Sequence, residues 1–225
     1  MNIFPQGDIM LKIEDNKMDF SGKKVACVGD SLTYGTTLLN RKKECYPARL
    51  QRLLGSNYDV INLGLVGHTV NSFCSKFWGQ PKMIKALNDY APDYILFMLG
   101  TNDANLKNWM DENVFRSEYT KLVNYLLNLP SNPTIIALTP PSAFSDTCER
   151  EVGFDVEVLD KIVNIQKSVL QELDIKFIDL YSMTKDKEHL YSIDKQHFNS
   201  HGAKFLAYVA YLGLKDTIER SGQNL

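Results

Sequence analysis

Five short apolar segments recur along the chain, and each is followed by a polar loop and then by a stretch with helical periodicity. They are residues 24–29, 58–64, 93–100, 133–139 and 176–181. Each segment is almost continuously apolar instead of alternating between apolar and polar residues, which is typical of strands buried on both faces. The pattern predicts a parallel β-sheet that is covered by helices on both sides.

Segments with a period near 3.6 residues lie between these apolar runs. The clearest are residues 46–54, 112–129, 156–173 and 203–218. Strands that alternate with helices in this way require right-handed crossovers within one sheet. We therefore predict a three-layer α/β/α sandwich that forms a single domain over residues 22–225, preceded by an N-terminal extension at residues 1–21.

The charged residues exclude some classes of partner. The formal net charge is −2, and the short basic runs at 23–24 and 41–43 are typical of solvated surface, so we expect no nucleic-acid partner.

No run of about 18 apolar residues is present, so we expect no membrane-spanning helix and no membrane partner. Residues 1–10 lack the features of a signal peptide, although a mature secreted protein would look the same. The expected location is cytoplasmic.

The four cysteines form no C-x-x-C pair, so the spacing of a zinc site is absent. They are Cys27, Cys45, Cys74 and Cys148. We interpret them as reduced thiols, in agreement with a cytoplasmic location. We expect neither a metal nor another cofactor.

Ser31 lies in Gly29-Asp30-Ser31-Leu32, directly after the first predicted strand. Open parallel sheets bind ligands beyond the carboxyl ends of their strands. A serine at such a strand-to-helix turn presents its hydroxyl there, with backbone N–H groups of the next turn pointing inward. Taken alone the position is ambiguous, because a serine at the start of a helix more often only caps it.

Gly64 and Asn102 follow the second and third predicted strands. The N–H of Gly64 and the side-chain amide of Asn102 are suited to donate hydrogen bonds to an oxyanion beside Ser31. Each also has an ordinary structural explanation, since glycine favours turns and asparagine favours Asx-turns and helix caps. The nearby Asp30 and Asp103 are expected to anchor loops.

Asp194 and His197 are three residues apart near the end of the chain. A carboxylate at this spacing can hold the Nδ1 proton of His197 and leave Nε2 free to accept the proton of Ser31. An isolated D-x-x-H pair would be unremarkable, but here it completes a set of residues that all follow predicted strands.

These blocks, in this order, resemble the GDSL or SGNH hydrolase family, which is named after its Ser, Gly, Asn and His blocks. The matching residues are Gly29-Asp30-Ser31-Leu32, Gly64, Gly100-Thr101-Asn102-Asp103 and Asp194-x-x-His197. The resemblance spans about residues 23–202. One departure is Phe198-Asn199 after the histidine, where many members have proline.

The resemblance implies a flavodoxin-like sandwich with a five-stranded parallel sheet, a shallow site and no metal. It also implies roles for three residues, with Ser31 as nucleophile, His197 as base and acid, and Asp194 as the orienting carboxylate. The oxyanion would be held by the N–H groups of Ser31 and Gly64 and by the amide of Asn102. The expected reaction passes through an acyl-enzyme on Ser31, which water then hydrolyses.

The substrate is less strongly indicated. The predicted loops are short, which disfavours a tunnel for long acyl chains. Trp78 and Trp109 follow the second and third strands, where their rings would either stack on a sugar or simply pack. The sequence is similar to bacterial carbohydrate acetylesterases, which implies a small-molecule ester such as an acetylated sugar as the partner. Periodicity indicates no oligomer interface.

Other functions stay open at this point. A thioesterase or lysophospholipase would use the same residues, and a catalytically inactive scaffold or sugar-binding protein would keep only the fold. A flavodoxin-like carrier of FMN is suggested by the hydroxyl-rich segment 31–37, which resembles a phosphate loop with one residue too many. The FMN carrier leaves Asn102 and the pair of Asp194 and His197 unexplained.

Overall fold

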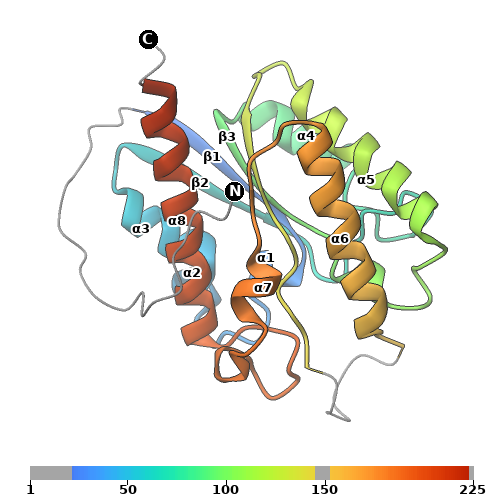
Figure 1. The fold of residues 1–225 in the computed structure, drawn as a ribbon. Helices are drawn as coiled ribbons and strands as arrows, with labels where there is room; N and C mark the ends of the chain where they lie inside the picture. Colours follow the sequence, from blue (N-terminus) through green and yellow to red (C-terminus); the bar gives the residue numbers. More distant parts are fainter. Residues whose placement is uncertain (1–21, 145–152, 223–225) are drawn as a thin grey trace.

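The computed structural model describes residues 22–144 and 153–222. Five parallel strands form one sheet in the order β2-β1-β3-β4-β5. The strands are β1 (Lys23–Gly29), β2 (Tyr58–Gly64), β3 (Tyr94–Met98), β4 (Thr134–Leu138) and β5 (Phe177–Ile178). The predicted α/β sandwich with a five-stranded parallel sheet is confirmed (Figure 1).

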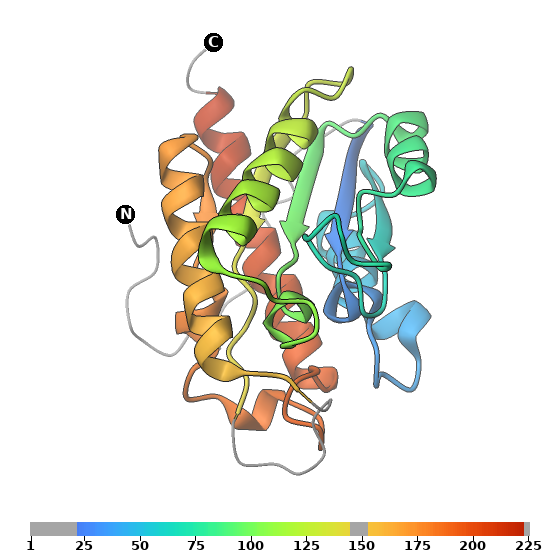
Figure 2. The ribbon, with the colours of Figure 1, turned by 90° about the vertical axis from the view of Figure 1, so that its right-hand side faces the viewer.

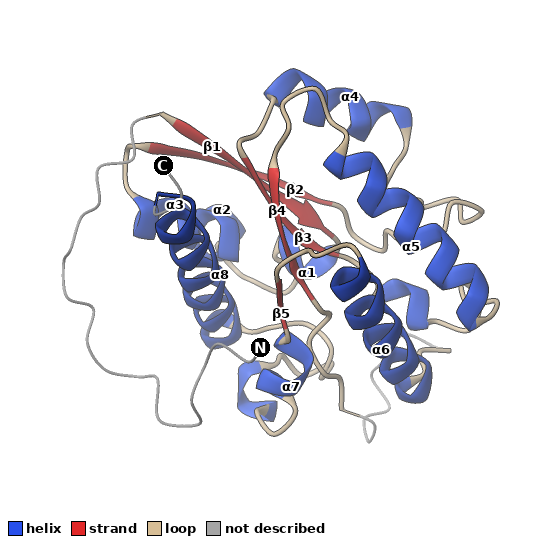
Figure 3. Cartoon of the chain, turned by 45° about the horizontal axis from the view of Figure 1, so that its top comes forward, coloured by secondary structure: helices blue, strands red, loops and turns tan. Residues whose placement is uncertain are grey.

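Helices cover both faces of this sheet (Figures 1 and 3). On one face lie α4 (Pro81–Tyr90), α5 (Glu112–Leu127) and α6 (Val156–Glu172). On the other face lie α1 (Ser31–Tyr34), α2 (Arg41–Glu44), α3 (Tyr46–Leu54) and α8 (Ser200–Gly222). The connections also contain the 3₁₀ turns η1 (Asn102–Ala104) and η2 (Glu188–Leu190) and the short helix α7 (Leu180–Thr184).

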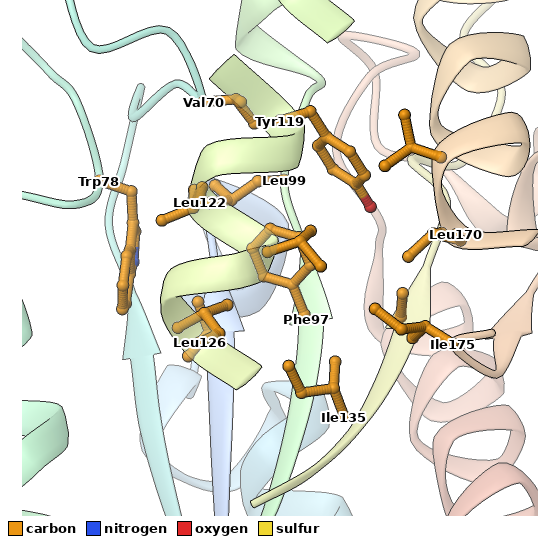
Figure 4. Close-up of a cluster of buried hydrophobic side chains, with 14 of the residues drawn as sticks. Val70, Trp78, Phe97, Leu99, Tyr119, Leu122, Leu126, Ile135, Leu170 and Ile175 are labelled. Atoms are coloured by element: carbon orange, nitrogen blue, oxygen red, sulfur yellow. The ribbon is translucent and has the colours of Figure 1, made fainter. Parts of the chain in front are cut away.

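The continuous apolar character of the strands follows from this burial on both faces. In β1, Ala26 and Val28 pack into the core under α4, α5 and α6, whereas Val25 and Cys27 pack under α3 and α8. Successive side chains of a strand point to opposite faces, so every position must be apolar when both faces are covered. Figure 2 shows α5 and α6 lying across the near face, and Figure 4 shows side chains of the core beneath them.

The structure differs from the predicted elements at β5 and at α4. The last predicted strand, residues 176–181, is shortened to β5 because Asp179 caps α7, accepting a hydrogen bond from the N–H of Ser182. Helix α4 was not among the helices expected from periodicity, and Leu87 is its one buried residue. Met83, Ile84 and Leu87 recur at helical spacing and pack against the core, so the periodic pattern of α4 is present in the sequence and was overlooked.

The strand order determines where a site can form. The chain passes from β1 to β2 on one side and then returns to β3 on the other side of β1. The carboxyl ends of β1 and β3 therefore border the point where the strand order reverses, which is where such sheets bind ligands. Ser31 follows β1 and Asn102 follows β3, so the fold brings these two predicted residues to that point.

Some predictions fall outside the described residues. These are the N-terminal extension at 1–21, Cys148, and the middle of the loop after β4. Within the part of the chain that the structure does describe, no helix combines the length and the apolar character needed to cross a membrane.

Candidate active site

Ser31 is the first residue of α1, immediately beyond the end of β1. Asp30 caps this helix, and its Oδ1 accepts a hydrogen bond of 2.9 Å from the N–H of Leu32. Gly29 permits the tight turn, because a Cβ there would lie 2.1 Å from Oγ1 of Thr33. The side chain of Ser31 is nearly buried, and its N–H has no partner among the described residues, as is usual for the first residue of a helix.

His197 reaches Ser31 from the other end of the chain. Its Nε2 lies 2.8 Å from Oγ of Ser31, and its Nδ1 lies 2.8 Å from Oδ2 of Asp194. With Nδ1 donating its proton to the carboxylate, Nε2 becomes the acceptor for the serine hydroxyl. The structure thus brings together the three residues that the sequence indicated, in a serine–histidine–carboxylate arrangement.

Asp194 is held in place by its own turn. Its Oδ1 accepts hydrogen bonds from the N–H groups of Gln196 at 3.1 Å and His197 at 2.9 Å. Burial alone would raise the pKa of Asp194, but these bonds and the bond from the His197 ring outweigh burial, so the pKa lies below the usual 3.8. The carboxylate is therefore ionised at neutral pH and stabilises positive charge on the imidazole.

The segment that carries His197 is tied to the loop after α1. Oγ1 of Thr37 donates to the carbonyl of Phe198 at 3.1 Å, and Oγ of Ser192 donates to Oγ1 of Thr37 at 2.9 Å. The N–H of Ser192 donates in turn to the carbonyl of His197 at 2.7 Å. These bonds fix the position of the histidine relative to the helix that begins at Ser31.

Asn199, one of the two residues that depart from the family pattern, has a clear structural role. Its Oδ1 accepts hydrogen bonds from the N–H groups of His201 and Gly202 at the start of α8, at 2.9 and 3.1 Å. Its Nδ2 donates to the carbonyls of His189 and Tyr191 at 2.8 and 2.9 Å. Asn199 therefore caps α8 and anchors the preceding loop, and the departure leaves Ser31 and its partners intact.

Asn102 opens η1 at the carboxyl end of β3 and is nearly buried. Its Nδ2 donates one hydrogen bond to the carbonyl of His68 at 2.9 Å, and its backbone carbonyl accepts a bond of 2.8 Å from Nδ2 of Asn108. The second proton of the Asn102 amide has no acceptor among the described residues. Asn102 therefore retains one side-chain donor in a fixed position.

Asp103 holds the loop after β2 against η1. Its fully buried carboxylate accepts hydrogen bonds from the N–H of Val70 at 3.0 Å and from the N–H of Asn71 at 3.1 Å. Burial raises the pKa of Asp103 to about 7 despite these bonds, and the nearby charge of Asp30 acts in the same direction. Burial likewise raises the pKa of Asp30 to about 6. Both residues anchor loops, as expected.

Gly64 does not offer its N–H to the site, contrary to expectation. This N–H donates to Oδ1 of Asn62 at 2.9 Å, and a Cβ on Gly64 would lie 2.2 Å from the backbone nitrogen of Tyr34. Gly64 is thus the point at which β2 packs closely against α1. Three residues later, Gly67 lines the same pocket as Asn102, and its N–H has no partner in the described chain.

The signal for Gly67 was present in the sequence. Segment 62–67 contains two glycines, and β2 ends at the first of them. The second lies in the loop, with a φ of 76° that favours glycine. From the sequence alone we expect the glycine at the end of the strand to be the donor, because residue types do not show which N–H is already bonded.

Trp78 is not on the rim of the site, which corrects a second expectation. Its ring is fully buried in the core beneath α5, and Nε1 donates to the carbonyl of Leu63 at 3.0 Å (Figure 4). Trp109 is partly buried and packs on Phe115, with ring centroids 6.0 Å apart. Trp78 faces inward because the loop after β2 folds back onto the sheet.

Within the described ranges, no group of three or more His, Cys, Asp or Glu side chains is placed to hold a metal ion. Cys27, Cys45 and Cys74 are free thiols in this structure. None of the three is among the groups that meet at Ser31.

Relatives of known sequence match over most of the chain. The sequence profile of the GDSL-like lipase/acylhydrolase family matches residues 27–205. An acetylxylan esterase from Xylanibacter ruminicola is 29% identical in an alignment 210 residues long that covers 85% of this chain and 43% of that protein. The chain therefore spans less than half the length of this relative.

Solved structures show the same fold. The aryl esterase of M. smegmatis matches with a TM-score of 0.72 and 19% identity, over 87% of this chain and 99% of that one. A carbohydrate acetylesterase family member from Sinorhizobium meliloti matches with a TM-score of 0.67 and 24% identity, over 88% and 98%. The profile match is more specific than these likenesses in fold, because it covers well over half of the chain, from β1 into α8. The chain therefore belongs to the GDSL-like lipase/acylhydrolase family, whose members are hydrolases that act on ester bonds.

Proposed function

We propose that this chain is a serine esterase that removes short acyl groups, chiefly acetyl, from carbohydrate esters. The observation that carries the proposal is the unbroken series of contacts from Asp194 through His197 to Ser31, with 2.8 Å at each link. A hydroxyl bonded to a neutral imidazole, itself bonded to an ionised carboxylate, is the arrangement that activates serine as a nucleophile.

The first half of the reaction forms an acyl-enzyme. Oγ of Ser31 attacks the carbonyl carbon of the ester, and its proton passes to Nε2 of His197. The tetrahedral intermediate then collapses, the bond from the carbonyl carbon to the alkoxy oxygen breaks, and His197 returns the proton to the leaving alcohol. Asp194 stabilises the imidazolium that exists between these two transfers.

The second half releases the acid. Water gives a proton to Nε2 of His197 as its oxygen attacks the acyl carbon on Ser31. Collapse of this second intermediate breaks the bond to Oγ, and the proton on His197 returns to the serine. The carboxylic acid leaves and the starting enzyme is restored.

Three donors would hold the negative oxygen of each intermediate. They are the N–H of Ser31, the free amide proton of Asn102 and the N–H of Gly67, which replaces Gly64 in this role. Asp103 and the carbonyl of His68 fix these groups before substrate arrives. Donors fixed in this way stabilise developing charge without reorganising at the moment of reaction.

The preference for short acyl groups and sugars is supported by the pocket beside Asn102 and by the relatives. This pocket, of about 230 Å³, is lined mainly by polar side chains, and a long aliphatic chain would leave their polar groups unpaired. The named relatives include an acetylxylan esterase and a carbohydrate acetylesterase family member.

The test is hydrolysis of p-nitrophenyl acetate, butyrate and octanoate by the wild type and by Ser31→Ala. We expect activity that depends on Ser31 and falls with chain length, and acetate release from acetylated xylo-oligosaccharides. Faster hydrolysis of a thioester or a lysophospholipid would favour those substrate classes instead. Equal rates for the wild type and Ser31→Ala would overturn the proposal.

A further inference from the structure

The pocket beside Asn102 carries positive charge that the esterase mechanism does not use. Two segments line it, the loop after β2 with Gly67, Ser75 and Lys76, and the segment after η1 with Lys107 and Asn108. Among the described residues that line it, none is an aspartate or glutamate. A pocket that presents the ammonium of Lys76 together with several hydrogen-bond donors is suited to an anion.

The backbone around Lys76 holds its side chain beside Gly67, one of the proposed oxyanion donors. The N–H of Thr69 donates to the carbonyl of Lys76 at 2.9 Å, and the N–H of Trp78 donates to the carbonyl of Thr69 at 3.0 Å. Because Trp78 is buried in the core, this short ladder fixes Lys76 next to Gly67. A Cβ on Gly67 would lie 2.9 Å from Nζ of Lys76, so the ammonium lies across the face of that glycine.

The ammonium of Lys76 is not neutralised by the rest of the described chain. No described carboxylate forms an ion pair with it, whereas many other lysines are paired with an acid within 4.0 Å. An exposed lysine beside a glycine does not by itself destabilise the fold. Because Lys76 lines the same pocket as Asn102, its charge can interact with a group bound in that pocket.

The segment after η1, which also lines the pocket, is held in place by hydrogen bonds as well. Nδ2 of Asn108 donates to the carbonyl of Asn102 at 2.8 Å, and the carbonyl of Asn108 accepts a bond of 2.8 Å from Nδ2 of Asn71. The N–H of Lys107 donates to Oδ1 of Asn105 at 3.2 Å. The pocket therefore keeps its shape next to the reacting carbonyl, and a bound anion would lie within a few atoms of the scissile ester.

We propose that Lys76 binds an anionic group of the substrate, such as a carboxylate, and so makes the enzyme selective for acidic esters. This inference rests on the proposed esterase function and names the substrate class of that site. The anionic group is carried either by the alcohol half or by the acyl half of the ester. Both cases place the same charge in the same pocket, and matched substrates distinguish them.

The experiment compares charged and neutral esters that differ only in that charge. For the alcohol half, the pair is 3-(4-acetoxyphenyl)propanoate and its carboxamide. For the acyl half, the pair is mono-p-nitrophenyl adipate and p-nitrophenyl adipamate. The readout is the ratio of kcat/KM for the charged ester to that for the neutral ester, because a general disturbance of the loop would lower both values together.

We expect a ratio of about 3 to 10 for one of the two pairs, acting through KM and shrinking at high salt, as is typical of partly exposed charges. Lys76→Met, which keeps the apolar stem, should bring the ratio to about 1, and Lys76→Arg should restore most of it. Lys215→Met, on the last turns of α8, is the matched control and should keep the wild-type ratio. A ratio near 1 for both pairs in the wild type, or an unchanged ratio in Lys76→Met, would overturn the inference.

A binding measurement separates failure of this inference from failure of the proposed function. The probes are 3-(4-hydroxyphenyl)propanoate and its amide, followed by NMR shifts of backbone amides in the 67–76 loop. Tighter binding of the acid by the wild type but not by Lys76→Met would support the pocket even if no ester were hydrolysed. Equal binding of acid and amide by the wild type would refute an anion site for the alcohol half even if the esterase were active, and the adipate pair then decides the acyl half.

Discussion

The Nε2 atom of His197 lies 2.8 Å from the Oγ atom of Ser31, although 166 positions separate the two residues along the chain. The parallel sheet makes this contact possible, since the loops that follow its strands meet at one edge. Bonds from Thr37 to Phe198 and from Ser192 to Thr37 then hold the two loops together. The site therefore depends on a few contacts between loops as well as on the fold.

Replacing Asp194 with Asn should separate the charge of this side chain from its role in the turn. Asn keeps an oxygen that can accept the N–H bonds of Gln196 and His197. It loses the charge that stabilises the imidazolium, so kcat/KM for p-nitrophenyl acetate should fall about 100- to 10,000-fold with a nearly unchanged Tm. Activity within about threefold of the wild type would mean that Asp194 serves only the turn.

Asn102→Ala should lower kcat by about 100- to 1000-fold, which is the usual loss for one oxyanion donor, with a smaller effect on KM. The substitution also removes the bond to the carbonyl of His68, so the melting temperature must be measured beside the kinetics. A large rise in KM with an unchanged kcat would indicate that Asn102 binds the substrate in its ground state instead.

Gly64→Ala should destabilise the fold, because the new Cβ would lie 2.2 Å from the backbone nitrogen of Tyr34 and would push β2 away from α1. Such overpacking costs about 1–3 kcal/mol or more in the free energy of unfolding. The control is Gly222→Ala, since a Cβ there meets no heavy atom within 4 Å. Thermal unfolding that shows equal Tm values for the two variants would contradict this role for Gly64.

Asp103 should make the stability of the protein depend on pH in a defined direction. Burial raises its pKa to about 7, well above the value near 3.9 of an unfolded chain, so the folded protein binds the proton more tightly. The contribution of Asp103 to stability is therefore fully present below about pH 4 and is lost as pH rises to about 7.

Urea unfolding of the wild type and Asp103→Asn at pH 5 and pH 8 measures this effect. The free energy of unfolding of the wild type, relative to the variant, should be lower at pH 8 than at pH 5. Asp30 must be considered too, since its pKa is raised to about 6 and the two carboxyl groups repel each other when both are charged. A difference that stays flat or rises with pH would contradict the assignment.

The fold could be predicted well from sequence because its signal is local and repeated. The segment 46–54 was predicted as a helix and coincides with α3, and the segment 58–64 coincides with β2. Both signals arise from burial of apolar side chains, which is encoded in the residue types themselves. By contrast, α4 was overlooked although Met83, Ile84 and Leu87 form an apolar face on it that packs against the core.

The site was predictable only in part. Ser31, Asp194 and His197 were identified because few other functions require those residue types in that order, and the structure places them in mutual contact. The distinction between Gly64 and Gly67 depends on which N–H is already bonded, and the direction of the Trp78 ring depends on how a loop folds back. Both depend on tertiary structure, which a local sequence pattern does not reveal.

Covalent labelling of Ser31 shows whether its hydroxyl is an activated nucleophile. The protein is treated with a p-nitrophenyl alkylphosphonate, which releases nitrophenol when an activated serine attacks phosphorus, and is then analysed by intact-mass and peptide mass spectrometry. We expect one adduct per chain, on the peptide that contains Ser31, absent from Ser31→Ala and formed far more slowly by His197→Ala. An unlabelled wild type, or equal labelling of Ser31→Ala, would contradict it.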